Sequence, residues 1–356
     1  MDFTFNEEQT LIQDQVDQFV QKEYDWETRQ SLSNSDLGFG ESNWQKFAEL
    51  GWLGISVSED SGGFGGSAIE SMLIMEAFGK GLVVEPFLET MIMAGSLIDD
   101  HGSDEQKSSV LEPAISGEMH LALAYAEPQS RFNLSDVVTE AKADGENYIL
   151  NGYKSVVMNG PSANKIIISA RTSSSQLDEN GITLFIVDSD SKGLAKTNYK
   201  TEGGRRASDL TLENVSVSKD NIIGSLDSGF EILDSAIDKA ILAISAEAVG
   251  AMEVLYKTTV EYTKTREQFG TSIGKFQVLQ HRMVDMFMEA EFTKSFLLKV
   301  LATHEIDEKR KLIYGLKNQV AHAGKLVAEE AVQMHGGMGC TAVSYTHLTL
   351  PTKRIV

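Results

Sequence analysis

The sequence predicts an α+β protein in which an antiparallel β domain lies between two helical segments. Helical periodicity dominates residues 1–118. Between 119 and 225, short β-branched and aromatic runs alternate with turn dipeptides, and no helical pattern separates them. Helical periodicity then returns and continues to 341. The expected domains are therefore an N-terminal α-helical domain over 1–118, a central β domain over 119–225 and a C-terminal helical bundle over 226–341.

The N-terminal segment shows one amphipathic helix near its start and another after a glycine-rich loop. Ile12, Val16 and Phe19 recur at helical spacing on one face. A second apolar stripe, from Ile69 to Phe78, follows four glycines between positions 62 and 66. These glycines lack the Gly-x-Gly-x-x-Gly spacing of a phosphate-binding loop, and no clear strand precedes them. A plain turn is therefore favoured.

Five short runs predict strands of the central domain. Asp144-Gly145 and Asn151-Gly152 are dipeptides typical of hairpin turns, and Asn214 precedes a further valine alternation. Since no helix intervenes, the sheet is expected to be antiparallel rather than doubly wound. The runs are Val137-Val138, Tyr148–Leu150, Ile166–Ile168, Leu184–Val187 and Val215–Val217.

Three helices are expected in the C-terminal segment. The first begins near Phe230, and the second follows Gly274. The third runs from about 311 to 335 and ends at Gly336-Gly337, because glycine readily adopts the conformation that terminates a helix. After it, Val343–Thr352 resembles the translation of a sequencing adapter. We therefore expect 342–356 to be a non-native tail, and the bundle to be incomplete in a C-terminally truncated fragment.

Composition points to a globular protein of a reducing compartment. The 356 residues include a single cysteine, Cys340, so no internal disulfide is possible. The N-terminus lacks the basic flank and apolar run of a signal peptide, and no run approaches the roughly 18 apolar residues of a membrane span. The net charge of −21 disfavours nucleic acid as a partner, and the histidines show no metal-ligand spacing. We expect a cytoplasmic protein without a metal site, a nucleic-acid partner or a membrane span.

Two short motifs follow the first bundle helix. Arg266, taken alone, is more simply explained as a cation that answers the helix dipole than as a phosphate ligand, although a guanidinium binds diphosphate oxygens well. Gly270–Lys275 imitates both a Walker loop and a Gly-x-Ser-x-Gly elbow. A Walker loop would need one more residue and a magnesium-binding hydroxyl at the position of Phe276. A Gly-x-Ser-x-Gly elbow would need a strand before it, whereas a long helix is expected there. Both alternatives are rejected.

Five motifs stand in order along the chain: Ala124–Asp136, Asn151–Lys154, Arg266–Gly270, Phe276–His281 and Gln333–Gly337. Through them the chain resembles the acyl-CoA dehydrogenase family over residues 1 to about 341. The resemblance implies that family's fold, with an N-terminal helical domain, a central β domain and a four-helix bundle. Glu85–Leu88 and Glu247–Glu253 are most similar to the small subunit of two-component, pimeloyl-CoA-type dehydrogenases.

The resemblance implies FAD as the cofactor, with its isoalloxazine ring on the β domain. Tyr125 and Ala126 would face the ring by their backbone, and Ser135 would lie near the flavin phosphates or the CoA chain. The opposite edge of the ring would be covered by three consecutive residues, Val156, Val157 and Met158.

A second group of residues would bind the diphosphate and adenine of a neighbouring subunit's FAD. In this context the phosphate role of Arg266 is favoured over the helix cap. A shared cofactor implies an oligomer, and we expect a homotetramer or a heterotetramer with a larger dehydrogenase subunit. The group comprises Arg266, Gln268, Phe269, Gln277, Gln333, Gly336 and Gly337.

Several positions depart from the family's usual residues. Ala126 stands where many members have Thr, and Val156 and Met158 stand where Trp and Thr are usual. Side-chain contacts to the flavin would be lost there, whereas backbone contacts can remain. The stretch from Pro128 to Ser135 is also longer than usual, which affects the placing of Ser135.

The family's reaction is the oxidation of an acyl-CoA thioester to the trans-2-enoyl-CoA, with electrons passed to an electron-transfer flavoprotein. The glutamate base usually lies in a loop well past Gly337, so no base can be named, and the fragment is expected to be inactive. Some members place the base at the position of Ala240, and Ile241 stands where many carry Arg. Asp238 matches a residue that contacts the CoA moiety.

Two other functions stay open. The chain can be a non-catalytic partner subunit of a heteromeric dehydrogenase, which Ala126, Met158 and Ile241 favour. It can also be a flavin-dependent monooxygenase or nitroalkane oxidase on the same fold. Oxygen consumption without enoyl-CoA formation would be diagnostic of that last class.

Overall fold

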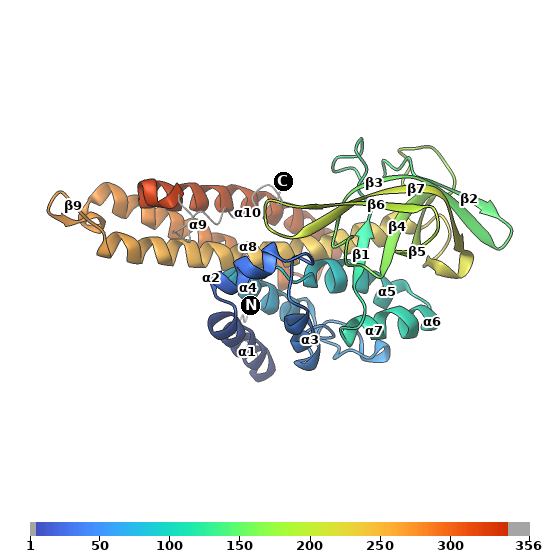
Figure 1. Ribbon diagram of the computed structural model, residues 1–356. Coiled ribbons are helices and arrows are strands. Elements are labelled where there is room, and N and C mark those ends of the chain that lie inside the picture. The colour runs from blue at the N-terminus through green and yellow to red at the C-terminus, as the bar shows by residue number, and fades with distance from the viewer. Residues whose placement is uncertain (1–4, 341–356) are drawn as a thin grey trace. The chain divides into compact units, whose positions relative to one another are not determined.

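A computed structural model describes residues 5–340 (Figure 1). Its elements follow the predicted order of helices, sheet and helices. The described residues divide into two compact units, one of residues 5–30, 68–83 and 241–340, the other of Ser31–Ser67 and Val84–Ala240. In the described part of the chain, no helix is both long enough and apolar enough to span a membrane.

The first unit is helical. Asn6 caps its first helix in a reciprocal pair of hydrogen bonds with Gln9, and Val16, Phe19 and Val20 form the buried face that the periodicity predicts. One long helix, α8, begins in the second unit and continues into this one. The elements are α1 (Glu7–Glu23), α4 (Ala68–Gly81), α8 (Gly229–Thr265), β9 (Glu267–Gln268), β10 (Thr271–Ser272), η5 (Ile273–Lys275), α9 (Gln277–Leu301), α10 (Ile306–His335) and η6 (Gly336–Cys340).

Within this unit, α4 and α8 approach closely at two glycines. A Cβ on Gly79 would lie 1.8 Å from the carbonyl oxygen of Glu247, and one on Gly250 would lie 1.9 Å from that of Glu76. Only glycine fits at these two positions. The carboxylate of Glu76 in turn accepts from Lys294 of α9 at 2.7 Å, which ties α9 to α4.

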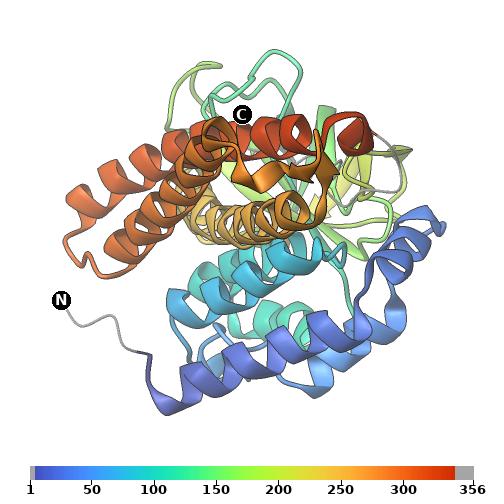
Figure 2. The same ribbon diagram turned by 90° about the vertical axis from the view of Figure 1, so that its left-hand side faces the viewer.

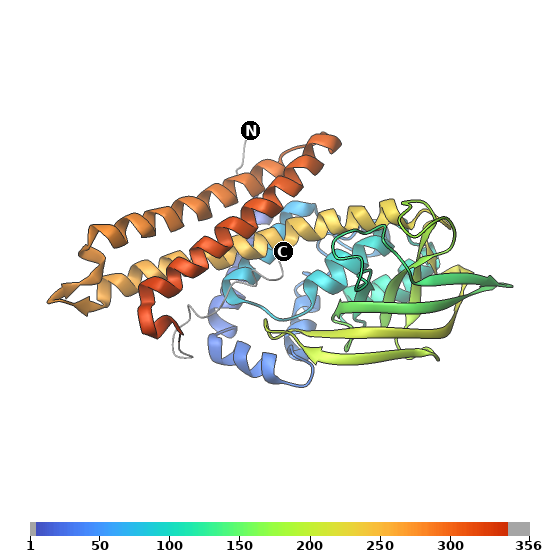
Figure 3. The ribbon, with the colours of Figure 1, turned by 90° about the horizontal axis from the view of Figure 1, so that it is seen from above.

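The last helix starts five residues earlier than predicted. Glu305 caps it by accepting from the amides of Asp307 and Glu308, a local bond that apolar periodicity does not reveal. The helix ends as expected at Gly336, where φ is 57°. α10 packs beside α9, as both the end view and the top view show (Figures 2 and 3).

The second unit combines the sheet with short helices, two of which, η2 and η3, are π-helical. Trp44, Phe47 and Trp52 are almost completely buried among the helical segments. The helical elements are α2 (Trp26–Asn34, which starts in the first unit), α3 (Glu41–Glu49), η1 (Glu59–Ser61), η2 (Leu88–Gly95), α5 (Ser96–His101), α6 (Asp104–Gln106), η3 (Lys107–Leu111), α7 (Glu112–Ile115) and η4 (Lys219–Asn221).

The sheet has the order β6-β7-β3-β2-β4-β5-β8, and β1 pairs with β4 outside that path. It is not purely antiparallel as expected: β1 runs parallel to β4, and β2 meets β4 in one parallel pair. A long connection separates β1 from β4, which permits the parallel pairing. The strands are β1 (Leu121–Ala124), β2 (Glu140–Asp144), β3 (Asn147–Met158), β4 (Lys165–Arg171), β5 (Ile182–Asp188), β6 (Leu194–Lys200), β7 (Arg206–Ser218) and β8 (Ile222–Ile223).

Two predicted β features are wrong. Val137 and Val138 precede β2 instead of forming a strand, because the Val138 amide donates to a buried carboxylate. Asn151-Gly152 is not a turn but lies inside β3 at a register shift, where a Cβ on Gly152 would come within 2.5 Å of Thr139. The Asp144-Gly145 turn between β2 and β3 is confirmed.

Candidate functional site

A buried ion pair organises the end of β1, where the flavin ring was predicted to lie. Glu127 lies three residues after the end of β1, and its Oε1 accepts from Nζ of Lys154 on β3 at 2.7 Å, with both side chains almost fully buried. The carboxylate also accepts from Gln129 at 2.8 Å and from the amides of Val138 and Thr139 at 2.8 and 3.1 Å. One carboxylate therefore holds three chain segments together.

The ionisation of this pair reflects its burial. Burial raises the pKa of Glu127. The charge of Lys154 and the hydrogen bonds to the carboxylate lower it by more, so the net shift is downward. Burial lowers the pKa of Lys154 to about 8, although Glu127 opposes the shift. Both groups are therefore charged at neutral pH, and the pair is fully formed there.

The residues before Glu127 are Tyr125 and Ala126, and a backbone hydrogen bond holds Ala126. The Ala126 carbonyl accepts from the Ser155 amide of β3 at 2.9 Å, whereas the Ala126 amide donates to no group among residues 5–340. Tyr125 is mostly buried, and burial raises the pKa of its hydroxyl. The free amide lies where the sequence predicts a backbone contact to the flavin.

Ser135 is buried in the loop between β1 and β2. Its hydroxyl donates to Oδ1 of Asn133 at 2.9 Å, and its carbonyl accepts from Arg171 at 2.8 Å. The same guanidinium also donates to the carbonyls of Gln176, Asp178 and Asn180, between 2.7 and 2.9 Å. Arg171 thus fixes this loop against the turn before β5.

The three residues predicted at the ring edge differ in exposure. Val156 is 54% exposed and has a positive φ of 55°, Val157 is buried in the sheet core, and Met158 is intermediate. Val157 can therefore reach a ligand only through its main chain. The Val156 amide donates to Asp209 of β7 at 2.9 Å.

Arg266, which was predicted to bind the diphosphate of FAD, lies at the C-terminal end of α8 beside a tight hairpin. β9 and β10 are joined at Phe269 and Gly270, whose φ values of 56° and 77° match a type I′ turn. Phe269 is 92% exposed, with its ring 6.3 Å from that of Phe276. Arg266 is exposed, and its guanidinium makes no ion pair or hydrogen bond with the described residues.

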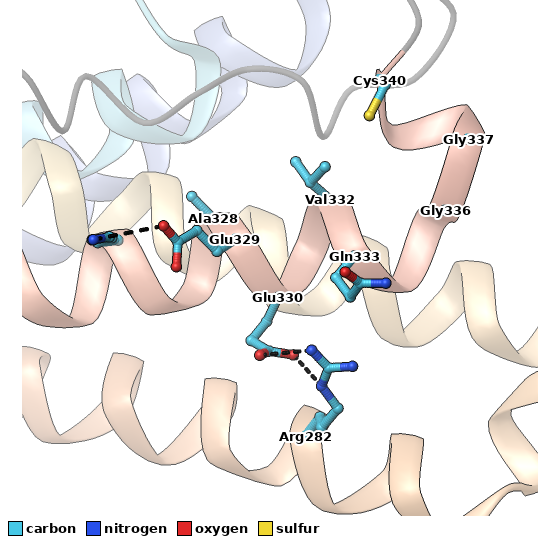
Figure 4. A pocket seen from close by; sticks show the side chains of 10 residues that line it. Arg282, Ala328, Glu329, Glu330, Val332, Gln333, Gly336, Gly337 and Cys340 are labelled. Atoms are coloured by element: carbon cyan, nitrogen blue, oxygen red, sulfur yellow. Dashed lines mark hydrogen bonds and ion pairs between the residues drawn. The ribbon is translucent and has the colours of Figure 1, made fainter.

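The end of α10 supplies a hollow with a volume of about 960 Å³ (Figure 4). Gln333, Gly336 and Gly337 line it, together with Arg282 of α9, which pairs with Glu330. No described atom lies within 4 Å of where a Cβ would stand on either glycine, so the backbone is open to a ligand.

A stacked ring pair links this hollow to the hairpin. Tyr262, one turn before Arg266, stacks on His335 with ring centroids 4.1 Å apart and 21° between the planes. The predicted second group thus comes together at one end of the helical unit, with Gln268 on β9 and Gln277 at the start of α9 both exposed. Figure 2 views the unit from this end.

Three neighbouring residues of α8, Asp238, Ala240 and Ile241, were singled out by the sequence as positions near the catalytic base or the CoA. Ala240 is buried and offers only a methyl group, and the partly buried Ile241 is equally inert. Asp238 is partly buried, and burial raises its pKa to about 6. On a helix, residues two positions apart do not face one another, so Asp238 does not substitute for a base at position 240.

The structure also bears on the rejected motifs. The amides of the four glycines between 62 and 66 donate to carbonyls of residues 55–59, so they are not available to a phosphate. Gly270–Lys275 comprises the end of the hairpin turn, the second hairpin strand β10 and the short helix η5, and so does not form an elbow between a strand and a long helix. No cluster that could hold a metal ion occurs among residues 5–340. The predicted tail, 342–356, lies outside the described residues.

Sequence reasoning missed three contacts that shape the site. The Glu127–Lys154 pair joins two of the recognised motifs, but spacing alone does not show that they meet. Asp209 and the Tyr262–His335 stack depend on strand register and helix packing in the same way.

Three family models match the chain in succession. They describe the acyl-CoA dehydrogenase N-terminal domain over residues 6–118, the middle domain over 122–215 and the C-terminal domain over 227–351. The last match includes part of the segment that was expected to be a non-native tail. A 3-(aryl)acrylate reductase of Clostridium sporogenes is 32% identical over 303 residues, or 83% of this chain and 80% of that protein. The chain belongs to the acyl-CoA dehydrogenase family.

Other members of the acyl-CoA dehydrogenase family are similar over nearly the whole chain. Subunit CarC of the caffeyl-CoA reductase–Etf complex of Acetobacterium woodii is 29% identical, over 94% of this chain and 89% of that protein. A solved structure, the FAD complex of PigA, has a TM-score of 0.91 and 25% identity, and covers 99% of this chain and 94% of that one. The predicted fold class is confirmed.

Proposed function

We propose that this acyl-CoA dehydrogenase family member oxidises an acyl-CoA thioester between Cα and Cβ and passes the electrons to an electron-transfer flavoprotein. FAD is its cofactor, as in the similar FAD complex of PigA. The flavoprotein partner is supported by similarity to CarC, a subunit of a reductase–Etf complex.

The observation that carries the proposal is an unpaired guanidinium beside an exposed aromatic ring. Arg266 has no acidic partner among the described residues, although the chain has a net charge of −21. Phe269 is almost fully exposed on the same hairpin, and Gly336 is open to a ligand nearby. A guanidinium suits a diphosphate and an exposed ring suits an adenine, so the donor set fits the outer half of FAD.

The β domain fits the inner half of FAD. The free amide of Ala126 can donate to the polar edge of the ring, and the exposed Val156 can cover the ring's apolar part. These contacts would take the place of those that Thr at position 126 and Trp at position 156 make in the family pattern. Ser135 is proposed to lie near the flavin phosphates or the CoA chain, and Asp238 to contact the CoA moiety.

The chemistry requires a base and a stabilised thioester oxygen. In this reaction a base removes the α-proton and the β-hydrogen leaves as hydride, for which bound FAD supplies the acceptor. The α-proton is acidic only if hydrogen bonds stabilise charge on the thioester oxygen. The chain's own residues bind and orient the acyl-CoA and exclude water from it. No carboxylate stands at position 240 to serve as the base.

A second candidate is a non-catalytic subunit that completes the site of a larger dehydrogenase chain. The buried methyl group of Ala240 and the aliphatic Ile241 favour it, because neither can take a proton. A homo- or heterotetramer is part of both candidates. Val284, Met288 and Phe292 expose an apolar stripe along one face of α9 that a second chain could cover. The closeness to pimeloyl-CoA small subunits remains a proposal.

The cofactor assignment is tested by Arg266→Ala. Loss of a charge-assisted contact should weaken FAD binding by about 10- to 100-fold. FAD affinity is measured by titration of the apoprotein in its oligomeric form. The control is Arg310→Ala, which removes a different exposed arginine, on α10, and should leave FAD affinity unchanged. Equal affinities of Arg266→Ala and wild type would contradict the diphosphate role.

The two candidates are separated by anaerobic bleaching of the flavin with medium-chain and dicarboxylic acyl-CoA. A catalytic subunit bleaches when assayed alone. A non-catalytic partner does not bleach alone, but it increases bleaching by the larger chain when the two are combined. Since general-base catalysis contributes about 10²–10⁴-fold, the two outcomes are well separated in rate.

A further inference from the structure

The pairing of β3 with β7 is interrupted beside the residues proposed to contact the flavin ring. The register shifts between Lys154 and Val157, so that two residues of β3 lie opposite Asp209 alone. Such a β-bulge bends the strand and re-aims its side chains, and bulges are frequent next to active sites. The bulge therefore decides which way the proposed ring-edge residues point.

Val156, the second residue of the bulge, has a strained backbone. Its φ of 55° is a conformation that β-branched residues rarely adopt. Burial does not hold it there, because the side chain is 54% exposed. A residue in such a conformation persists only where neighbouring groups fix it, and strain of this kind is concentrated at functional sites.

Asp209 accepts from the Val156 amide and is itself held by two tyrosines. Its Oδ1 accepts from the Val156 amide at 2.9 Å and from the Tyr199 hydroxyl at 3.0 Å. Its Oδ2 accepts from the Tyr153 hydroxyl at 2.7 Å. The two tyrosines hold the carboxylate in place from β3 and β6, and the carboxylate holds the amide.

These groups keep their ionisation states around neutral pH. Burial raises the pKa of Asp209, but the hydrogen bonds from Val156 and the tyrosines outweigh it and leave the pKa lowered. Burial and its hydrogen bond to Asp209 raise the pKa of Tyr199 to about 12, and the separate hydrogen bond from Tyr153 to Asp209 raises the pKa of Tyr153. The anchor is thus a carboxylate with neutral hydroxyl donors.

We propose that Asp209 is a positioning residue for the cofactor, which holds Val156 in its strained conformation and so fixes the edge of residues 156–158 against the flavin ring. This inference rests on the proposed function, since it takes residues 156–158 as that edge. Without the carboxylate, the Val156 amide loses its acceptor and the valine can relax towards the extended conformation that it favours. Relaxation would turn the ring-edge residues away from the ligand.

A double-mutant cycle on Asp209 and Val156 tests the proposal. Asp209→Ala should raise the Kd for FAD about tenfold and alter the shape of the visible flavin absorption bands. Glycine adopts positive φ without strain, so it needs no anchor. In the Val156→Gly background, Asp209→Ala should therefore change the Kd by less than about twofold, whatever Val156→Gly does by itself.

Two further variants define the outcome. Asp209→Asn keeps an acceptor for the Val156 amide and should bind FAD more tightly than Asp209→Ala. Asp188→Ala removes an exposed carboxylate from β5 of the same sheet, paired with Lys165, and should bind FAD like wild type. If Asp209→Ala does not fold, the cycle is run with Asp209→Asn, where a smaller effect in the Val156→Gly background is again expected.

The inference is overturned if Asp209→Ala folds and binds FAD with wild-type affinity and spectrum. An equal loss in the wild-type and Val156→Gly backgrounds would also overturn it, because it would mean that Asp209 does not act through the strained valine. Failure of the wild-type protein to bind FAD would instead refute the proposed function, and the cofactor role of Asp209 with it. The wild-type titration thus separates the two failures.

Discussion

The end of the β domain and the hairpin end of the helical unit both carry residues proposed to contact FAD, but the chain holds them differently. In the β domain, Glu127 and Lys154 are buried, paired with one another and bonded to several further groups. At the hairpin, Arg266 has no partner among the described residues and Phe269 is 92% exposed. In the β domain, buried polar contacts fix the backbone around the free Ala126 amide, whereas the hairpin presents side chains that no described residue holds.

This difference teaches which half of the proposed cofactor site is preorganised. A backbone fixed by buried polar contacts costs little further ordering when a ligand binds. Exposed cationic and aromatic side chains lose conformational freedom on binding, and they gain contacts only from a ligand or a second chain. We therefore expect mutations in the β domain to affect folding and cofactor binding together, and mutations at the hairpin to affect cofactor binding alone.

The largest expected effect is that of Lys154→Met. It leaves the Glu127 carboxylate buried without its counter-charge, which should lower the free energy of unfolding by about 3–5 kcal/mol. FAD binding should weaken as well, because Glu127 and Lys154 are the chain neighbours of Ala126 and Ser155, whose backbone hydrogen bond lies at the proposed ring site. The measurement is urea unfolding at pH 7, where the pair is charged.

Two companion variants sharpen this result. Glu127→Gln/Lys154→Met removes both charges and should be more stable than Lys154→Met alone. Lys165→Met breaks an exposed pair in the same sheet and should cost less than about 1 kcal/mol. A Lys154→Met protein as stable as Lys165→Met would show that the buried pair does not organise the β domain.

A smaller effect is expected at Asp238, a partly buried carboxyl with a pKa of about 6. Because this folded-state pKa exceeds the ordinary value of 3.8, the buried carboxylate is destabilising above about pH 6, and the penalty disappears as the pH falls towards 4. Asp238→Asn should raise the free energy of unfolding by about 1 kcal/mol at pH 7.5, allowing for partial exposure, and by much less at pH 4.5. A difference that does not depend on pH would contradict this explanation.

The smallest effect on stability is expected from Phe269→Ala at the hairpin. The exposed ring contributes little to folding, so the free energy of unfolding should change by less than about 0.5 kcal/mol. FAD affinity should nevertheless fall about three- to tenfold, as for the loss of one aromatic contact. Chemical unfolding and FAD titration on the same protein give both values. A clear loss of stability with unchanged FAD affinity would reverse the proposed contrast between the two regions.

Local patterns predicted most of the fold. The helices that start near Phe230 and after Gly274, and the stop at Gly336, follow from apolar spacing and from the backbone freedom of glycine. The pairs that form between distant segments did not follow. β1 and its parallel pairing with β4 were not anticipated, although a strand at Ile166–Ile168 was predicted, and Asn151-Gly152 has the composition of a turn but lies within a strand.

The sequence by itself determined the order of the helical and β segments, the approximate starts of α8 and α9, the end of α10 and, through its motifs, the residues to examine for FAD. Tertiary structure alone decided that Glu127 meets Lys154, that Asp209 holds a strained Val156, and that Arg266 has no partner in the described chain. The physical reason is the sequence separation over which each kind of interaction acts. Periodicity and capping act within a few residues, whereas a buried charge or a strained φ is maintained by groups that only folding brings together.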